Sequence, residues 1–220
     1  MTWIKICGIT NLEDAQTAVD AGADALGFVF YEKSPRKIDV ETARKIVTKL
    51  PSSIEKVGVF VNEPVEKILN TVVQAGLTGV QLHGVECRKL EFIRALKIGR
   101  DLKVFVVLPA TDINKGLDWN ENERASISAV FFDSGTPELP GGTGRTFDWN
   151  SAAAGIQAIG VNWNVVVAGG LNSSNVADAI RILEPWGVDV SSGVEAKPGK
   201  KDPDNIRAFI SAVRRADEIA

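Results

Sequence analysis

Short apolar runs alternate with amphipathic stretches along the chain. The apolar runs are rich in valine, isoleucine and phenylalanine, and this composition is typical of strands that are buried in a parallel sheet. We therefore predict eight strands, at Trp3–Cys7, Ala25–Phe30, Lys56–Val61, Gly79–Leu82, Lys103–Leu108, Ala129–Asp133, Asn164–Ala168 and Val188–Ser191.

The stretches between these runs carry hydrophobic residues at helical spacing, and residues that begin or end helices flank several of them. Thr10 or Asn11 can cap the first helix, which we expect Gly22 to end. Pro51 is expected to stop the second helix. The other helices are predicted at Val40–Leu50, Pro64–Ala75, Val85–Leu96, Ile113–Trp119, Trp149–Ile159, Val176–Leu183 and Pro203–Arg215.

Eight strand–helix units in 220 residues leave about 27 residues for each unit, which is the smallest size that closes a (β/α)8 barrel. No linker, low-complexity stretch or block of like charges divides the chain. We therefore predict one (β/α)8 TIM-barrel domain over residues 1–220. The main alternative is a doubly wound open sheet, but the turn Cys7-Gly8-Ile9-Thr10 lacks the glycine spacing of a dinucleotide-binding fold.

Charge and cysteine content narrow the class of protein. The net charge is −3 and the pI is about 5.4, whereas a nucleic-acid surface would need a basic stripe. No apolar run reaches the length of a membrane span, and the N-terminus lacks a signal-peptide core. Cys7 and Cys87 are too few for a disulfide scaffold, and with the single His83 they form no metal-ligand cluster. We expect a cytoplasmic protein without a metal, a nucleic-acid partner or a membrane partner.

Two reactive side chains stand where predicted strands end. Cys7 closes the first strand and Asp133 closes the sixth, and in barrels this end of the strands carries the chemistry. A free cysteine is more often a small buried hydrophobic residue, and an aspartate can simply cap the turn that follows it. If both residues line a barrel mouth, Cys7 can act as an acid–base group or a nucleophile. Asp133 can then act as a general acid, because a bound anion would raise its pKa.

Three glycine-rich turns follow the last three predicted strands. Their residues are Gly142, Thr143 and Gly144 after the sixth strand, Gly169 and Gly170 after the seventh, and Ser192 and Gly193 after the eighth. Glycines let backbone N–H groups approach an anion, and barrels often hold a phosphate in the loops after the last two strands. Tight connections without a ligand are the alternative. The turns favour a small, phosphorylated substrate.

Two polar residues follow strands in the first half of the chain. Arg36 lies on a proline-containing loop after the second strand, where its guanidinium suits a carboxylate, although a solvated basic loop explains it equally well. His83 follows the fourth strand and can line the pocket, but a single histidine often has a structural role. Cys87 lies in the predicted helix after His83, and we interpret it as non-catalytic.

Segments at every strand end together resemble the phosphoribosylanthranilate isomerase family of tryptophan biosynthesis. The resemblance runs in order over essentially the whole chain, although residues 108–128 contribute no motif to it. The segments that carry it are Lys5–Thr10, Gly27–Phe30, Gly58–Asn62, Gln81–Gly84, Phe132–Ser134, Gly142–Trp149, Ala168–Leu171 and Asp189–Glu195.

The resemblance implies an aldose–ketose isomerase that needs no cofactor and performs an Amadori rearrangement. It implies that N-(5-phosphoribosyl)anthranilate is converted to 1-(2-carboxyphenylamino)-1-deoxyribulose 5-phosphate. The family's general base falls on Cys7, its general acid on Asp133 and its carboxylate-binding arginine on Arg36. A thiol pKa is close enough to neutrality for this work, and we expect a nearby cation or helix N-terminus to lower it. Such a protein is expected to be a monomer or a homodimer.

Two other functions stay open. A sugar isomerase of histidine biosynthesis, or a bifunctional barrel that serves both pathways, would place an aspartate where Cys7 stands and would need a second anion site in the first half. A non-catalytic phosphate-binding barrel would have no reason to keep both Cys7 and Asp133 at strand ends.

Overall fold

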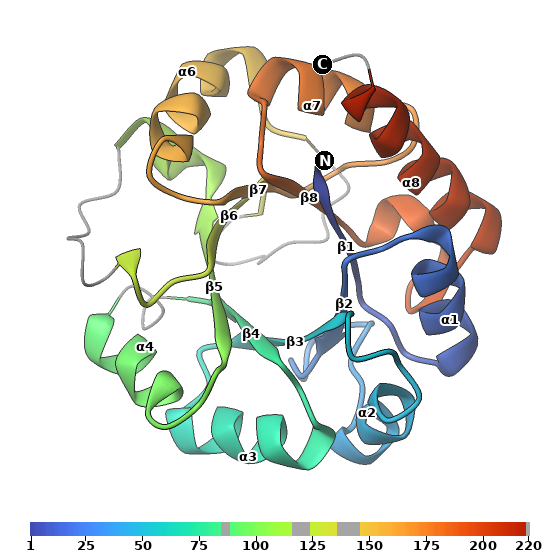
Figure 1. The fold of residues 1–220 in the computed structure, drawn as a ribbon, viewed down its shortest axis with the longest axis vertical. Helices are drawn as coiled ribbons and strands as arrows, with labels where there is room; N and C mark the ends of the chain where they lie inside the picture. Colours follow the sequence, from blue (N-terminus) through green and yellow to red (C-terminus); the bar gives the residue numbers. More distant parts are fainter. Residues whose placement is uncertain (85–88, 116–123, 136–145, 219–220) are drawn as a thin grey trace.

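Eight parallel strands close into a barrel at the centre of the molecule, and helices surround it (Figure 1). The computed structural model describes residues 1–84, 89–115, 124–135 and 146–218. Each strand pairs with the next strand in the chain, and β1 pairs with β8 to close the ring. The (β/α)8 barrel predicted from the sequence is confirmed. Its strands are β1 (Trp3–Cys7), β2 (Ala25–Val29), β3 (Glu55–Val61), β4 (Gly79–His83), β5 (Lys103–Pro109), β6 (Ala129–Asp133), β7 (Val165–Val167) and β8 (Gly187–Val190).

The helices form the outer ring, and local sequence sets their ends. The side chain of Asn11 accepts a hydrogen bond from the Asp14 N–H at 2.9 Å, so Asn11 rather than Thr10 caps α1. Gly22 ends α1 at a φ of 100°, where glycine is free of strain. The helices are α1 (Leu12–Ala21), α2 (Val40–Val47), α3 (Val65–Ala75), α4 (Leu90–Lys97), α6 (Trp149–Gly160), α7 (Val176–Leu183) and α8 (Pro203–Asp217).

Some helix bounds differ from the sequence prediction. The helix α2 ends at Val47 instead of Leu50, because the last residues before Pro51 bond to the third residue back and tighten the chain into turns. Residues 85–88 and 116–123 lie outside the described part of the chain. After β5 the structure has a 3-10 helix, η2 (Ala110–Lys115), where the sequence predicted the start of an α-helix.

A short hairpin follows β8, and the sequence pattern did not predict it. A 3-10 turn, η3 (Ser192–Val194), leads into β9 (Glu195–Lys197), which pairs antiparallel with β10 (Lys200–Lys201). Gly199 makes the turn between them at a φ of 81°. The two strands are so short and so charged that they carry no alternation of apolar and polar positions.

The inside of the barrel changes from apolar to polar along its axis. Trp3, Lys5 and Cys7 share the inward face of β1, because strand side chains alternate between faces. At the amino end Trp3 packs on Phe105 and Phe131, with ring centroids 5.9 and 6.2 Å away. Lys5 lies fully buried above this layer, and Cys7 lies at the carboxyl end. The apolar layer therefore closes one end of the barrel and leaves a polar mouth at the other.

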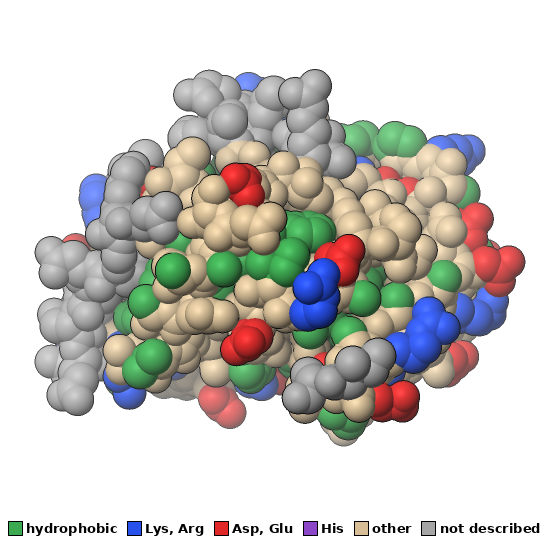
Figure 2. Space-filling model, turned by 90° about the horizontal axis from the view of Figure 1, so that it is seen from above, with side chains coloured by type: hydrophobic (Ala, Val, Ile, Leu, Met, Phe, Trp, Pro, Cys, Tyr) green, Lys and Arg blue, Asp and Glu red, His purple; other side chains and the backbone are tan. Residues whose placement is uncertain are grey.

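Most of the remaining core fills the space between the barrel and its helices, with Ile4, Ile6 and Phe28 among its fully buried members. On the face of the molecule that Figure 2 shows, positive and negative side chains are mixed rather than gathered by sign. No helix in the described part of the chain is long and apolar enough to cross a membrane.

Candidate active site

A cavity of about 330 Å³ opens at the carboxyl ends of the barrel strands. The candidate residues in its lining are Cys7, Arg36, His83, Asp133, Gly169, Gly170 and Ser192. They come from β1, β4 and β6 and from the connections after β2, β7 and β8. The candidates Gly142, Thr143 and Gly144 lie outside the described residues. The structure thus gathers in one cavity side chains that are far apart in the sequence.

Cys7 ends β1 with only 8% of its surface exposed. The next residue, Gly8, has a φ of 78°, and a Cβ there would lie 2.7 Å from Cδ of Arg36. Ser191 at the end of β8 donates its hydroxyl to the Cys7 carbonyl at 3.0 Å. Glycine at position 8 therefore lets the chain turn and lets Arg36 cross directly beside the thiol.

A buried ion pair lies below Cys7 in the barrel. Lys5 is fully buried, and its Nζ donates to Oδ1 of Asp189 on β8 at 2.9 Å. A Cβ at Gly27 would lie 2.7 Å from Sγ of Cys7 and 3.1 Å from Cε of Lys5. The absence of a side chain at Gly27 therefore leaves the space in which the ammonium stem and the thiol meet.

Burial raises the pKa of the Cys7 thiol, and this effect exceeds the lowering by Lys5 and Lys201. Asp189 adds to the rise. The cations expected from the sequence are present, but the expectation of a lowered thiol pKa is wrong, because a thiolate loses its hydration here. Burial also lowers the pKa of Lys5, yet Asp189 and Cys7 together outweigh burial and the net shift is upward, so Lys5 stays a cation.

Asp133 sits at the end of β6 on the cavity wall, where it is half-buried. Its Oδ1 accepts a hydrogen bond from the Gly135 N–H at 2.7 Å, so it does cap the turn that follows it. Burial raises the pKa of Asp133, and the Gly135 hydrogen bond offsets only part of this rise. The direction is the one expected for a general acid, although burial rather than a bound anion is its cause.

His83 lies deep in the cavity wall, and its Nε2 is 3.2 Å from Nε2 of Gln81. An amide nitrogen only donates, so in this arrangement His83 Nε2 accepts and the ring proton is on Nδ1. Burial, together with the charge of Lys5, lowers the pKa of His83 to about 4. The imidazole is therefore neutral at pH 7. Among the described residues, Oε1 of Gln81 has no partner, which leaves a buried acceptor on the wall.

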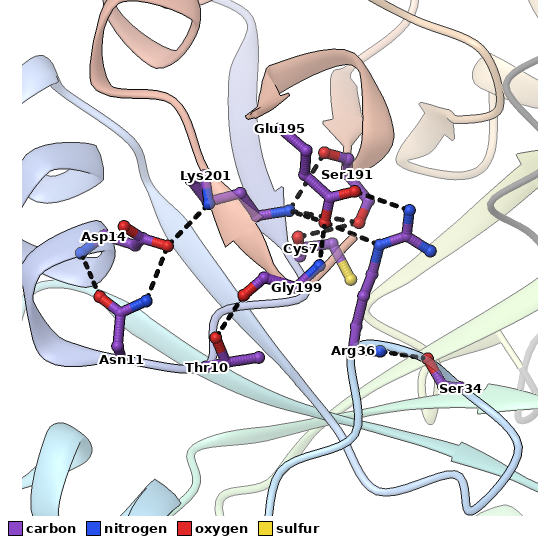
Figure 3. Close-up of polar contacts among 10 residues, drawn as sticks. All are labelled: Cys7, Thr10, Asn11, Asp14, Ser34, Arg36, Ser191, Glu195, Gly199 and Lys201. Carbon is purple, nitrogen blue, oxygen red and sulfur yellow. Dashed lines mark hydrogen bonds and ion pairs between the residues drawn. The ribbon is translucent and has the colours of Figure 1, made fainter. Parts of the chain in front are cut away.

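Arg36 is not a solvated loop residue, because its guanidinium is held by Glu195 of β9. Its Nε and Nη2 donate to Oε1 and Oε2 of Glu195, each at 2.8 Å (Figure 3). On its other side Glu195 meets the fully buried Lys201, whose Nζ lies 3.0 Å from Oε1. Arg36 thus reaches the cavity with its Nε and Nη2 already bound to Glu195. The sequence did not predict this pairing.

The glycine turns after β7 and β8 pack against neighbouring backbone. Gly169 and Gly170 have φ values of 87° and 66°. A Cβ at Gly169 would lie 2.2 Å from Oγ of Ser134, and one at Gly193 would lie 1.9 Å from the carbonyl oxygen of Leu171. Gly193 does not line the cavity but lets the last two connections approach each other. These close contacts bring the turns to the same corner of the mouth.

The sequence analysis missed several polar residues of the site. They are Lys5, Gln81, Asp189, Glu195 and Lys201. The first three leave a signal, since each is a polar residue in the middle of an otherwise apolar strand, where burial is costly without a partner. The last two belong to the unpredicted hairpin and leave no local signal.

Comparison with known proteins gives one consistent result. The family model for N-(5'-phosphoribosyl)anthranilate (PRA) isomerase matches residues 4–212. The N-(5'-phosphoribosyl)anthranilate isomerase of Pelobacter propionicus is 49% identical over 210 residues, which covers 96% of this chain and 94% of that protein.

Solved structures agree with the sequence comparison. The crystal structure of phosphoribosyl anthranilate isomerase from Thermotoga maritima superposes with a TM-score of 0.84 at 43% identity, covering 98% of this chain and 100% of that one. A structure of phosphoribosyl anthranilate isomerase in complex with reduced 1-(o-carboxyphenylamino)-1-deoxyribulose 5-phosphate has a TM-score of 0.78 at 41% identity, with the same coverage.

Proposed function

The chain belongs to the N-(5'-phosphoribosyl)anthranilate isomerase family, and we propose that it catalyses this isomerisation with Cys7 and Asp133. The substrate is N-(5-phosphoribosyl)anthranilate, the product is 1-(2-carboxyphenylamino)-1-deoxyribulose 5-phosphate, and the step belongs to tryptophan biosynthesis. One observation carries the residue assignment: a thiol from β1 and a carboxyl from β6 line a single cavity at the carboxyl ends of the strands. Tight glycine turns lie at the same mouth.

Asp133 is the general acid that opens the ribose ring. Its half-buried carboxyl has a raised pKa and so keeps its proton to higher pH than an exposed aspartate. It transfers this proton to the ring oxygen while the bond between that oxygen and C1′ breaks. The lone pair of the anthranilate nitrogen then forms a double bond to C1′, which gives an iminium ion and an Asp133 carboxylate.

Cys7 is the general base that acts on the iminium ion. The thiolate removes the proton from C2′, and the electron pair of that C–H bond forms the double bond between C1′ and C2′. The iminium nitrogen takes back its lone pair, which gives an enolamine. Tautomerisation moves the proton of the C2′ hydroxyl to C1′ and yields the ketone. The Lys5 ammonium favours the thiolate over the thiol.

The reactive state of this pair holds one proton, on Asp133 and not on Cys7. Burial raises the pKa values of both groups. The rate at low substrate therefore falls at acid pH, where Cys7 is a thiol, and at alkaline pH, where Asp133 has lost its proton. A bell-shaped dependence on pH follows, and its two apparent pKa values belong to the pair.

Binding residues surround this pair. Arg36 reaches the cavity from the β2 side and would bind the anthranilate carboxylate. The turns that contain Gly169, Gly170 and Ser192 would bind the phosphate through backbone N–H groups. The neutral His83 of β4 lines the same cavity without adding charge.

We also propose that the protein acts in the cytoplasm as a monomer or a homodimer. The low cysteine content supports a reducing compartment. Sedimentation at working concentration distinguishes the two assemblies.

Two substitutions test the roles of Cys7 and Asp133. We expect Cys7→Ser and Asp133→Asn each to lower kcat by about 10²–10⁴-fold, the usual contribution of general acid–base catalysis. Both are close in size to the native side chains, so neither should lower the melting temperature much. Cys87→Ser and Asp178→Asn serve as matched controls and should keep wild-type turnover. Near-normal turnover in either active-site variant would defeat that assignment.

Substrate preference separates this function from its closest alternative. Turnover of the sugar substrate of histidine biosynthesis at a comparable kcat/KM would contradict a single-substrate isomerase. We expect no comparable turnover, because position 7 carries a cysteine where the sister barrel is expected to carry an aspartate.

A further inference from the structure

The hairpin of β9 and β10 places a charged side chain in the interior beside the cavity. Lys201 is fully buried, and its Nζ lies 3.1 Å from the Ser191 carbonyl oxygen and 3.0 Å from Oε1 of Glu195. A buried ammonium is costly unless a charged partner and hydrogen bonds compensate it. Burial accordingly lowers the pKa of Lys201, while Glu195 opposes this shift. Formation of the two-residue strand β10 does not by itself account for a buried lysine at position 201.

Glu195 connects Lys201 to Arg36 (Figure 3). Its Oε1 accepts from Arg36, Lys201 and, at 3.2 Å, the Gly199 N–H, while its Oε2 accepts from Arg36. Burial raises the pKa of Glu195, but hydrogen bonds and charges from Arg36 and Lys201 outweigh it, and the net shift is downward. Glu195 is therefore a fixed anion with all its donors in place.

These contacts leave Arg36 one free edge. Nε and Nη2 are bound to Glu195, and among the described residues Nη1 has no partner. The stem of Arg36 packs on Gly8, where a Cβ would lie 2.7 Å from Cδ. Because the guanidinium is planar and held at two atoms, its orientation is set before a ligand arrives.

The hairpin itself is tied to the chain just after Cys7. Thr10 donates its hydroxyl to the Gly199 carbonyl at 2.5 Å. The buried Asp14 of α1 accepts from the backbone N–H of Lys201 at 2.8 Å. Ser191, which contacts Lys201, also donates to the Cys7 carbonyl. The support of Arg36 is thus fastened to the strand end that carries the base.

We propose that Glu195 and Lys201 are positioning residues that hold the guanidinium of Arg36 for the substrate carboxylate. The inference rests on the function proposed above. The three side chains carry two positive charges and one negative charge, so the cluster has a single excess positive charge. One carboxylate neutralises it, whereas an Arg36 without Glu195 would rotate and lose the preset geometry.

Two ligands that differ only in the carboxylate test this inference. The first is the reduced product, and the second is the same compound with a phenyl ring in place of the carboxyphenyl ring. The ratio of their Kd values measures recognition of the carboxylate alone. It should be measured in the wild type, Arg36→Met, Glu195→Gln, Lys201→Met and the matched control Lys197→Met, whose lysine is exposed on β9.

We expect Glu195→Gln and Lys201→Met to reduce the carboxylate preference about tenfold or more, as loss of a fixed charged contact does. In Glu195→Gln, KM should rise while kcat stays within about threefold, because Glu195 does not contact the reacting atoms. Lys201→Met also removes a charge that lowers the pKa of Cys7, so its readout is the ratio of Kd values alone. Lys197→Met should keep the wild-type ratio. If a single variant fails to fold, Glu195→Gln/Lys201→Met removes the buried pair together and should show the same reduced ratio.

Two results overturn the inference, and they are distinguishable. If Arg36→Met loses the carboxylate preference but the Glu195 and Lys201 variants keep it, or lose affinity for both ligands equally, the positioning role fails and the carboxylate site stands. If Arg36→Met itself keeps the preference, the carboxylate site proposed above is wrong, and the positioning role fails with it.

Discussion

On the β1 side of the mouth Cys7 is surrounded by ion pairs, whereas on the β6 side Asp133 has one hydrogen-bond partner among the described residues. Lys5 with Asp189 lies below the thiol, and the cluster of Arg36, Glu195 and Lys201 lies beside it. Among the described residues, Asp133 accepts a hydrogen bond only from the Gly135 backbone.

The difference supports the proposed roles of Cys7 as base and Asp133 as acid. Burial raises the pKa values of both groups. Lys5, through its charge and a hydrogen bond, and Lys201 oppose the rise at the thiol, whereas the charge of Lys5 and the Gly135 N–H oppose it at Asp133. The hydrogen bond from Lys5 stabilises a thiolate relative to a thiol, while Asp133 has no cationic hydrogen-bond partner among the described residues. Two titratable groups whose surroundings differ in this way take opposite roles in acid–base catalysis.

Removal of the Lys5 cation below Cys7 should have the largest effect on stability and activity. Lys5→Met leaves Asp189 buried without its partner, so we expect a loss of about 3–5 kcal/mol in the free energy of unfolding. We also expect kcat/KM to fall about 10²-fold, because the thiolate loses its favourable charge. Denaturant unfolding and steady-state kinetics measure the two effects.

A double variant separates stability from catalysis. Lys5→Met/Asp189→Leu removes both buried charges and should recover most of the stability but not the activity. Arg181→Met breaks an exposed pair with Asp178 and should change stability by less than about 0.5 kcal/mol. Recovery of wild-type kcat/KM in the double variant would show that Lys5 only fills the barrel.

Asp133 on the β6 side should have the next largest effect. Because its pKa is raised in the folded protein, it should make the free energy of unfolding depend on pH. Below the ordinary aspartate pKa, both the folded and the unfolded chain hold this proton. Between that value and the raised folded value only the folded chain holds it, so stability falls as pH rises through this range.

Asp133→Asn cannot lose a proton and should escape this fall. We expect its free energy of unfolding to increase relative to the wild type as pH rises from about 4, and then to level off above the folded pKa. Asp178→Asn is the reference for an exposed carboxyl. A constant difference between Asp133→Asn and wild type over this range would mean that burial does not hold the proton on Asp133.

The smallest effect on activity should come from the titration of His83, at the end of β4. Its pKa of about 4 keeps the ring neutral from pH 6 to 8, so no change in rate over this range should come from its protonation. As the single histidine of the chain, it gives one set of imidazole resonances in an NMR titration. Titration near the ordinary histidine pKa would contradict the burial and the nearby positive charge.

Local sequence was sufficient to predict the barrel and to place Cys7 and Asp133 at its mouth. Cys7 and Asp133 could be placed because each ends an apolar run, and the carboxyl ends of parallel strands meet at one mouth. The contact between Arg36 and Glu195 spans 159 residues, and no local pattern encodes it. The direction of the thiol pKa was misjudged for a related reason: the cations could be expected, but the degree of burial depends on the whole barrel.

The central claim is that Asp133 opens the ring and Cys7 then removes the C2′ proton. The most direct measurement is the primary kinetic isotope effect on kcat/KM with substrate deuterated at C2′, in the wild type, Cys7→Ser and Asp133→Asn. Slow proton removal in Cys7→Ser should raise the isotope effect well above the wild-type value. Slow ring opening in Asp133→Asn should bring it close to unity. The reverse pattern, or equal isotope effects in the two variants, would contradict the assignment of acid and base.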